Sequence, residues 1–211
     1  MLRFLCVSDI HGHAQALRAV LQEADGLGWD QLIACGDLLF PGPEPLGVWE
    51  LLQKHHAVCI QGIGDRALAR IDPGKLVPID EAQRKRAERL RAIRSELGDL
   101  ILARLAKLPP IVRLPLESGQ MMVVVHGSPK DPSECLTEDM SDEELLAMLG
   151  DEAADLVVCG GSHLPFDRVL DDVRIVNVGS VGEAPGGGYA TACIIETAQV
   201  GFKVSPLTVQ L

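Results

Sequence analysis

Apolar runs of strand length alternate with amphipathic segments through the first sixty residues. Within the runs the apolar residues are nearly continuous, whereas between them they recur every three or four residues, as on one face of a helix. The pattern predicts strands at residues 2–7, 31–35 and 57–60 and helices at residues 14–24 and 46–56. Such alternation is typical of a sheet whose strands are joined by helices.

A long polar stretch then follows. Residues 66–108 are predicted to be largely helical, until Pro109-Pro110 stops the last helix,. Basic residues gather on one face of that helix between Arg84 and Arg94. Pairs at helical spacing, Glu81 with Lys85 and Arg84 with Glu88, favour a solvated face over a surface for a polyanion or a partner.

The second half of the chain is rich in short strands. They are predicted at residues 111–116, 121–125, 155–159, 168–170, 174–177, 190–195 and 200–209,. Ser141-Asp142-Glu143-Glu144 is a capping box that begins a helix ending near Leu149,. The order of elements predicts a layered α/β sandwich with mixed sheets, as one domain over residues 1–211 with a helical insertion at about 66–108.

Charge and composition restrict the protein classes. The net charge of −11 disfavours general binding to nucleic acid, and no run of eighteen apolar residues predicts a membrane span,. The apolar run 2–7 is too short for a signal peptide, and the six cysteines form no CxxC pair, so we expect a cytoplasmic protein with reduced cysteines,. The mostly apolar C-terminal strands leave a homodimer open.

Five candidate metal ligands stand where predicted strands end: Asp9, His11, Asp37, His126 and His163. Taken singly, Asp9 is equally a helix cap, and a histidine at a strand end is more often a packed polar side chain. Ligands bind at the carboxyl ends of the strands in α/β sheets, so five such residues at strand ends indicate a shared site. The mixture of imidazole and carboxylate suits a divalent Mn, Fe or Zn ion.

In this order the motifs resemble those of the calcineurin-like metallophosphoesterases, and most closely their small bacterial phosphodiesterase and protein-phosphatase-like branch. The similar segments are Ser8–Leu17, Gly36–Pro45, Asp65–Leu68, His126–Pro129, His163–Phe166 and Val176–Gly182. The resemblance covers nearly the whole chain. It implies an α/β/β/α sandwich of two mixed sheets flanked by helices, and hydrolysis of a phosphate ester by metal-activated water.

The resemblance also implies how the ligands divide between two metals. Asp9, His11, Asp37 and His163 match the ligands of the first metal. The second metal of the family shares the residue matching Asp37, and His126 matches one of its further ligands.

Three positions depart from the family pattern. Ile63 stands where the family has an asparagine ligand, Gly64 where it has a catalytic histidine, and Gly161 where it has a second-metal histidine. Both lost ligands serve the same metal. We therefore expect one complete metal site and a second site short of ligands.

Two functions fit these departures. In the first, the protein is a hydrolase with one metal, acting on a small phosphate ester or a phosphoprotein, with His126 or His13 as acid or phosphate contact. In the second, it keeps the fold and one ion but serves as a binding or scaffold module. The intact first ligand set favours the hydrolase, because without an ion these buried polar groups would be poorly satisfied. The loop at residues 182–188 carries no arginine where the similar branch often has one.

Overall fold

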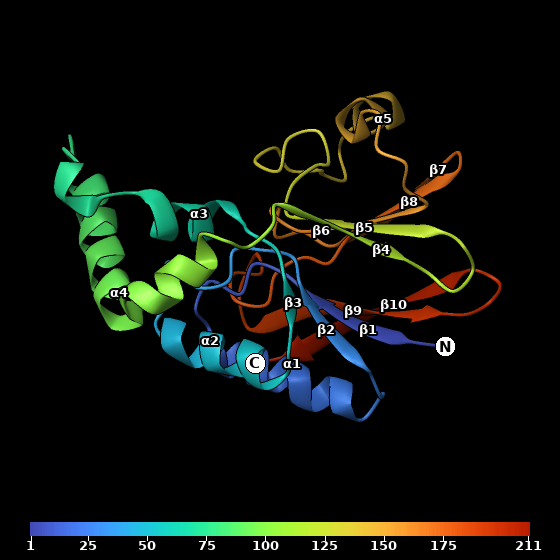
Figure 1. Ribbon diagram of the computed structural model, residues 1–211, viewed down its shortest axis with the longest axis horizontal. Helices are drawn as coiled ribbons and strands as arrows, with labels where there is room; N and C mark the ends of the chain where they lie inside the picture. The colour runs from blue at the N-terminus through green and yellow to red at the C-terminus, as the bar shows by residue number, and fades with distance from the viewer.

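Two five-stranded mixed sheets pack face to face, with helices on the outside of each (Figure 1). This is the arrangement in a computed structural model that describes all residues, 1–211. The predicted layered α/β/β/α sandwich is therefore confirmed.

The first sheet has the strand order β10-β9-β1-β2-β3. Its strands are β1 (Arg3–Val7), β2 (Gln31–Ala34), β3 (Val58–Cys59), β9 (Tyr189–Thr197) and β10 (Phe202–Gln210). Strands β1, β2 and β3 run parallel, while β9 is antiparallel to both of its neighbours. The carboxyl ends of β1, β2 and β3 consequently lie at one edge of the sheet.

The second sheet has the order β4-β5-β6-β8-β7. Its strands are β4 (Ile111–Pro115), β5 (Met121–Val125), β6 (Leu156–Cys159), β7 (Phe166–Leu170) and β8 (Val173–Asn177). The three central strands run parallel, and the two edge strands are antiparallel to them. This sheet, too, gathers the ends of its parallel strands at one edge.

The period of two along β1 explains why it lies between two layers. Leu5 and Val7 belong to the hydrophobic core shared with the helices, whereas Phe4 and Cys6 belong to the core between the sheets,. Helices α1 (Ala14–Asp25) and α2 (Pro45–Lys54) cover the outer face of the first sheet (Figure 1).

The outer face of the second sheet is covered by α5 (Asp142–Leu149) (Figure 1). Ser141 caps this helix, because its Oγ accepts the Glu144 N–H at 3.3 Å while the Glu144 carboxylate accepts the Ser141 N–H at 2.8 Å. The predicted capping box is confirmed.

Between β3 and β4 the chain forms α3 (Ile63–Arg70), the short 3₁₀ helix η1 (Pro73–Lys75) and α4 (Glu81–Leu105). These helices project from one end of the sandwich (Figure 1). Helix α4 kinks at Gly98, whose φ of 70° is non-helical,.

The basic face of α4 is not simply solvated, as the spacing of its charges predicted. Arg84 pairs with Glu81 instead of Glu88. Other arginines donate to backbone carbonyls of neighbouring segments: Arg89 to Pro41, Arg91 to Pro73 and Arg94 to Leu68. A guanidinium carries five donors on a long side chain, so it can reach carbonyls that a helix-spacing argument does not consider. Arg89 therefore fastens the insertion to the loop after β2, while Arg91 and Arg94 hold the helices of the insertion together.

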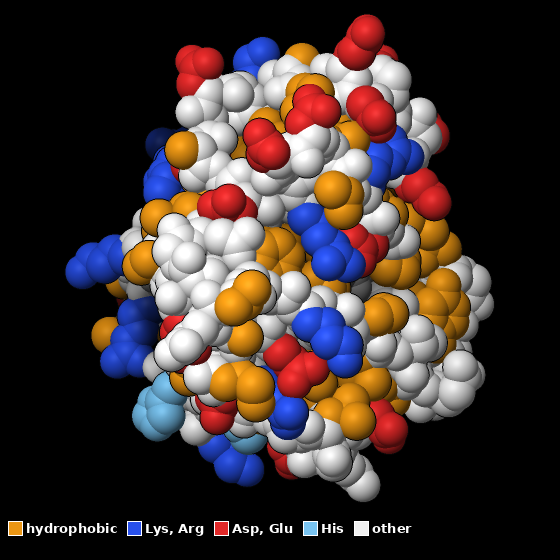
Figure 2. Space-filling view, turned by 90° about the vertical axis from the view of Figure 1, so that its right-hand side faces the viewer, with side chains coloured by type: hydrophobic (Ala, Val, Ile, Leu, Met, Phe, Trp, Pro, Cys, Tyr) orange, Lys and Arg blue, Asp and Glu red, His pale blue; other side chains and the backbone are white.

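The face at the right of Figure 1 shows no comparable basic region. On that face the basic side chains lie among acidic and hydrophobic ones and form no continuous patch (Figure 2).

No helix combines the length and hydrophobicity needed to cross a bilayer. All six cysteines are free thiols.

Candidate metal centre

Four loops at the ends of parallel strands carry the five candidate ligands. Asp9 and His11 follow β1, Asp37 follows β2, His126 follows β5 and His163 follows β6. The two sheets thus bring the loops that carry these residues to the same end of the sandwich, which is also where α3 begins (Figure 1).

Four of these residues have an unusual backbone conformation. The φ angles of Asp9, His11, Asp37 and His163 are 49°, 48°, 50° and 63°. Positive φ costs a residue other than glycine on the order of 1–3 kcal/mol, and persists where the surroundings impose it, often at functional sites. The backbone strain is therefore concentrated on the residues whose side chains converge.

Hydrogen bonds between loops hold this conformation. The Asp9 N–H donates to the Gly36 carbonyl at 3.1 Å, the His11 N–H to the Asp37 carbonyl at 2.9 Å, and the Ser180 hydroxyl to the Asp9 carbonyl at 2.8 Å. Close backbone approach is also required: a Cβ at Gly62 would lie 2.2 Å from the Asp37 nitrogen. A glycine at position 62 is therefore needed for this contact.

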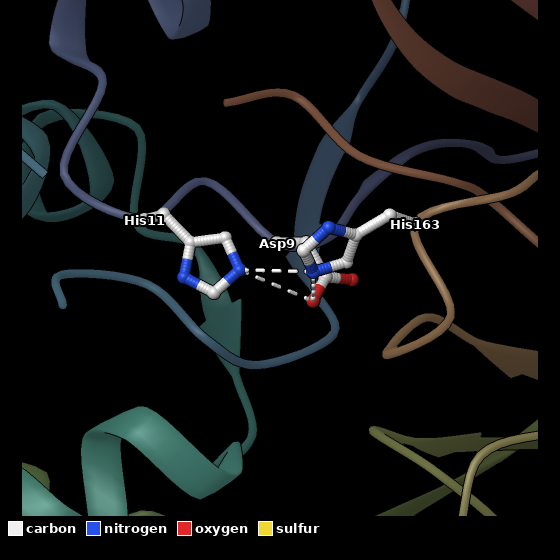
Figure 3. Close-up of side chains that lie close together, drawn as sticks. All are labelled: Asp9, His11 and His163. Atoms are coloured by element: carbon white, nitrogen blue, oxygen red, sulfur yellow. Dashed lines mark hydrogen bonds and ion pairs between the residues drawn. The ribbon is translucent and has the colours of Figure 1, made fainter. Parts of the chain in front are cut away.

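Asp9, His11 and His163 form the first group of converging donor atoms (Figure 3). Asp9 Oδ1 lies 3.2 Å from His163 Nε2 and 3.6 Å from His11 Nε2, and the two Nε2 atoms are 3.1 Å apart. Asp9 Oδ2 accepts the Gly161 N–H at 2.8 Å. Asp9 Oδ1 is the one buried side-chain oxygen or nitrogen without a hydrogen-bond partner.

The three histidines are oriented in the same way. Each Nδ1 lies at hydrogen-bond distance from a backbone carbonyl: His11 from Phe40 (2.6 Å), His126 from Cys35 (2.8 Å) and His163 from Glu183 (3.1 Å). If Nδ1–H donates to the carbonyl, Nε2 of the neutral ring carries the lone pair and faces the site. Histidines that ligate a metal usually donate their other ring N–H in this way. The orphaned Asp9 Oδ1 and these Nε2 atoms fit a divalent cation.

Asp9, Asp37 and His126 form a second group of donor atoms. His126 Nε2 lies 3.6 Å from Asp37 Oδ2, and Asp37 Oδ1 accepts the Gly64 N–H at 2.6 Å. The family resemblance implied that Asp37 lies with the first-metal ligands and is shared between both sites. The structure places Asp37 with Asp9 and His126, and Asp9 is the member common to both groups. The division of these ligands between two metals stays a prediction.

The carboxylates change the proton affinity of the histidines. Burial alone lowers the pKa of His11, but its contact with Asp9, the Phe40 carbonyl and the charge of Asp37 outweigh burial and raise the pKa to about 9,. Burial likewise lowers the pKa of His126, while Asp37 raises it more strongly, again to about 9. In the metal-free protein, these rings are therefore cations at neutral pH.

Asp65 connects the start of α3 to the loop that follows β2. Its buried carboxylate accepts the N–H groups of Leu38 and Gly62, each at 3.0 Å. Burial, followed by the charge of Asp37, raises the pKa of Asp65 to about 7, although both hydrogen bonds act in the opposite direction,. Asp65 positions the loop that carries Asp37.

The positions that depart from the family pattern offer no replacement ligand of their own. Ile63 is the first residue of α3, and its apolar side chain is 40% exposed. Gly161 has a φ of 77°, and a Cβ built on it would lie 2.6 Å from Cys135 Sγ. The thiol of Cys135 occupies the space into which a side chain at position 161 would extend.

Restoring the family histidine by Gly161→His is expected to lower the free energy of unfolding by about 1–3 kcal/mol, from left-handed backbone strain and crowding. Adding Cys135→Ala removes the crowding sulfur, so it should recover part of the loss. Urea unfolding of the single and double variants measures both effects. Equal stability of Gly161→His and the unchanged protein would contradict this account of Cys135.

His13 lies outside both groups of donor atoms. It directly precedes α1, and its Cδ2 would be 2.6 Å from a Cβ at Gly182. The catalytic roles predicted for His13 and His126 stay predictions. His126 faces Asp37, as described above, while His13 packs against the loop that begins at residue 182.

Sequence reasoning missed two residues at this centre. Glu183 Oε2 lies 3.7 Å from His11 Nε2, so the loop without a basic residue brings an acidic one to the site. Asn177 is buried, and its side-chain NH₂ lies within hydrogen-bond distance of the Gly160 carbonyl at 2.8 Å and the Ser162 Oγ at 3.0 Å. The sequence offered one signal for each residue: Glu183 is the one acidic residue of a glycine-rich loop, and Asn177 ends a predicted strand.

Comparison with known proteins agrees with this fold. An uncharacterised protein of Methanocaldococcus jannaschii is 26% identical over 97% of this chain and 86% of its own length. A hypothetical protein of Pyrococcus horikoshii has the same fold, with a TM-score of 0.84 at 20% identity over 100% of this chain and 88% of the other. A metallophosphoesterase of Sphaerobacter thermophilus gives a TM-score of 0.78 at 22% identity, over 99% and 89% of the two chains.

The match to a protein family also covers nearly the whole chain. Residues 2–199 match the calcineurin-like phosphoesterase superfamily domain, and this range includes both groups of donor atoms. The chain belongs to the calcineurin-like phosphoesterase superfamily.

Proposed function

We propose that the protein is a metal-dependent phosphoesterase that hydrolyses a phosphate mono- or diester with one firmly held divalent ion. The observation that carries the proposal is the unpartnered, buried Asp9 Oδ1, which faces the Nε2 atoms of His11 and His163. A buried carboxylate oxygen without a hydrogen bond is costly, and a cation at this point would satisfy it together with both imidazoles.

Some residues of the site would hold the ion, and others orient the side chains that hold it. Asp9, His11 and His163 would hold the ion, and Asp37 with His126 lies next to them. A bound divalent ion supplies Lewis acidity toward a phosphoryl oxygen and makes water a better nucleophile. The carbonyls of Phe40, Cys35 and Glu183 keep the three imidazoles in place.

The second candidate function is a binding or scaffold module that keeps the ion without useful turnover. Ile63 and Gly161 favour it, since neither provides a ligand, and Gly64 provides no acid for the leaving group. Removing a general acid typically costs about 10²–10⁴ in rate, so slow hydrolysis is compatible with the first candidate.

Metal analysis combined with an assay separates the two candidates. The purified protein is expected to contain one Mn, Fe or Zn per chain and to hydrolyse bis(p-nitrophenyl) phosphate with Mn²⁺. Asp37→Ala should reduce kcat at least about hundredfold, because it removes the carboxylate beside His126. Lack of hydrolysis of mono-, di- and pyrophosphate esters at every metal loading would exclude the hydrolase and leave the scaffold.

A further inference from the structure

A groove with two arginines begins beside the metal centre. Gly62, Ile63, Arg66 and Arg70 line one side, and the loop after His126 lines the other with Pro132 and Ser133. Ile63, Arg66 and Arg70 are spaced three and four residues apart on α3, so they share one helix face,.

These two arginines are free of protein partners. Arg66 and Arg70 are exposed, and neither donates a side-chain hydrogen bond or forms an ion pair. The arginines of α4 nearby are different, because Arg89 and Arg94 are fastened to backbone carbonyls. In a chain with a net charge of −11, two unpaired cations in one groove create a local site for an anion,.

The groove reaches the wall of the metal centre. A Cβ at Gly62 would lie 2.3 Å from Asp37 Oδ1, and the Gly64 N–H donates to that same oxygen. Ile63 lies between these two glycines and has no polar group to offer a ligand. A molecule held by its phosphate at the metal ligands could therefore extend along α3 past Ile63 to the guanidinium groups.

We propose that this groove binds a second anionic group of the substrate, a phosphate separate from the one that is hydrolysed. The substrate class is then a bisphosphorylated small molecule. This inference rests on the proposed function for the position of the first phosphate. Guanidinium groups suit phosphate because their planar donors can form paired hydrogen bonds with its oxygens.

One carboxylate near the groove, that of Asp131, partly offsets the positive charge of the two arginines. The Asp131 carboxylate accepts the N–H and hydroxyl of Ser133 at 2.9 and 2.6 Å. Those hydrogen bonds first, and the charge of Arg66 to a lesser extent, lower the pKa of Asp131, so it is ionised at neutral pH. The Asp131 carboxylate repels a bound anion. Asp131→Asn should therefore strengthen anion binding in the groove, whereas removal of an arginine should weaken it.

Calorimetric titration of the Mn²⁺-loaded protein tests the groove without relying on turnover. The probes are adenosine 3′,5′-bisphosphate against adenosine 5′-monophosphate, and fructose 1,6-bisphosphate against fructose 6-phosphate. The protein is expected to bind each bisphosphate about tenfold more tightly than its monophosphate. Preference in the adenosine pair alone would indicate a nucleotide source of the second phosphate, and preference in both pairs a general bisphosphate site.

In Arg66→Ala/Arg70→Ala this preference should fall below about twofold, whereas Arg66→Lys should keep most of it. Asp131→Asn should increase it about two- to threefold, and raising the salt concentration should weaken it. The matched control is Lys54→Ala, which removes an exposed cation at the end of α2 and should leave the preference unchanged.

Absence of a preference in the unchanged protein would overturn the inference, as would a preference that survives in the double variant or falls equally in Lys54→Ala. Those failures are distinct from failure of the proposed function. A chain that hydrolyses the chromogenic diester but shows no preference for bisphosphates would lack only the groove site. A chain without turnover that still prefers bisphosphates through Arg66 and Arg70 would be a binding protein for them.

Discussion

Asp9→Asn is expected to lower the affinity for the divalent ion at least about hundredfold and to leave a metal-poor protein after gel filtration. Loss of a residue that only hydrogen-bonds to a ligand typically costs about 10–100-fold in metal affinity, and Asp9 itself belongs to both groups of donor atoms,. Asparagine has nearly the same volume, and its oxygen can still accept the Gly161 N–H. The variant therefore removes the charge without emptying the site.

Competition with a chromophoric chelator measures the affinity, and elemental analysis measures the metal content. The matched control is Asp99→Asn, which removes one negative charge from an exposed position on α4. We expect this control to bind the ion like the unchanged protein. An Asp9→Asn variant that retains one metal per chain with unchanged affinity would show that Asp9 Oδ1 is not a ligand.

The loss of Asp9 also has a consequence for the metal-free protein. The Asp9 carboxylate is held ionised, because its contacts with His11 and His163 and the charge of His126 lower its pKa despite burial. A lowered pKa stabilises the fold above the ordinary pKa of an aspartate and ceases to do so in strong acid. In Asp9→Asn the cationic histidines lose this partner, so metal-free Asp9→Asn should unfold at lower urea concentration at neutral pH.

Local patterns were sufficient to predict most of the fold. The alternation of apolar runs predicted β1 and β2 closely, and Ser141 with Glu144 predicted the start of α5. The strand predicted at residues 57–60 is shorter, Val58–Cys59, because only these two residues pair with β2 at the sheet edge. Hydrophobic periodicity identifies a strand but does not determine how many of its residues find partners.

The site was less predictable where it depends on contacts between distant segments. The motifs implied that Asp37 is shared between both sites and that His126 belongs to the second, but the distance of 3.6 Å between their side chains depends on how the loops after β2 and β5 approach one another. Cys135 in the space beside Gly161 could not be foreseen, since the two residues lie on separate loops. Neither relation leaves a periodic or compositional trace in the sequence.

Binding of the divalent ion should tighten steeply as the pH rises from 7 to 9. In the metal-free protein, the pKa of His11 and of His126 is about 9, above the usual value of 6.5. At pH 7 each ring carries a proton that it must lose before Nε2 can ligate. The affinity should therefore rise about tenfold per pH unit for each histidine that ligates, and level off above pH 9.

The sign for the metal-free fold is the opposite. A histidine with a raised pKa stabilises the folded state fully below its unfolded pKa of 6.5, and this contribution disappears as the pH rises through 9,. The metal-free protein should thus lose stability over the range in which the metal-bound protein gains it. The difference between their urea midpoints should widen with pH.

Calorimetry in two buffers of different ionisation enthalpy counts the protons released when the ion binds. His11 alone gives a release close to one proton at pH 7, and a value close to two means that a second ring with a raised pKa, His163 or His126, also becomes neutral,. His56→Asn, which changes an exposed histidine that joins neither donor group, is expected to leave the count unchanged. Affinity that stays constant from pH 7 to 9 without proton release would mean that these imidazoles do not bind the ion, because a ligating Nε2 has to be free of its proton.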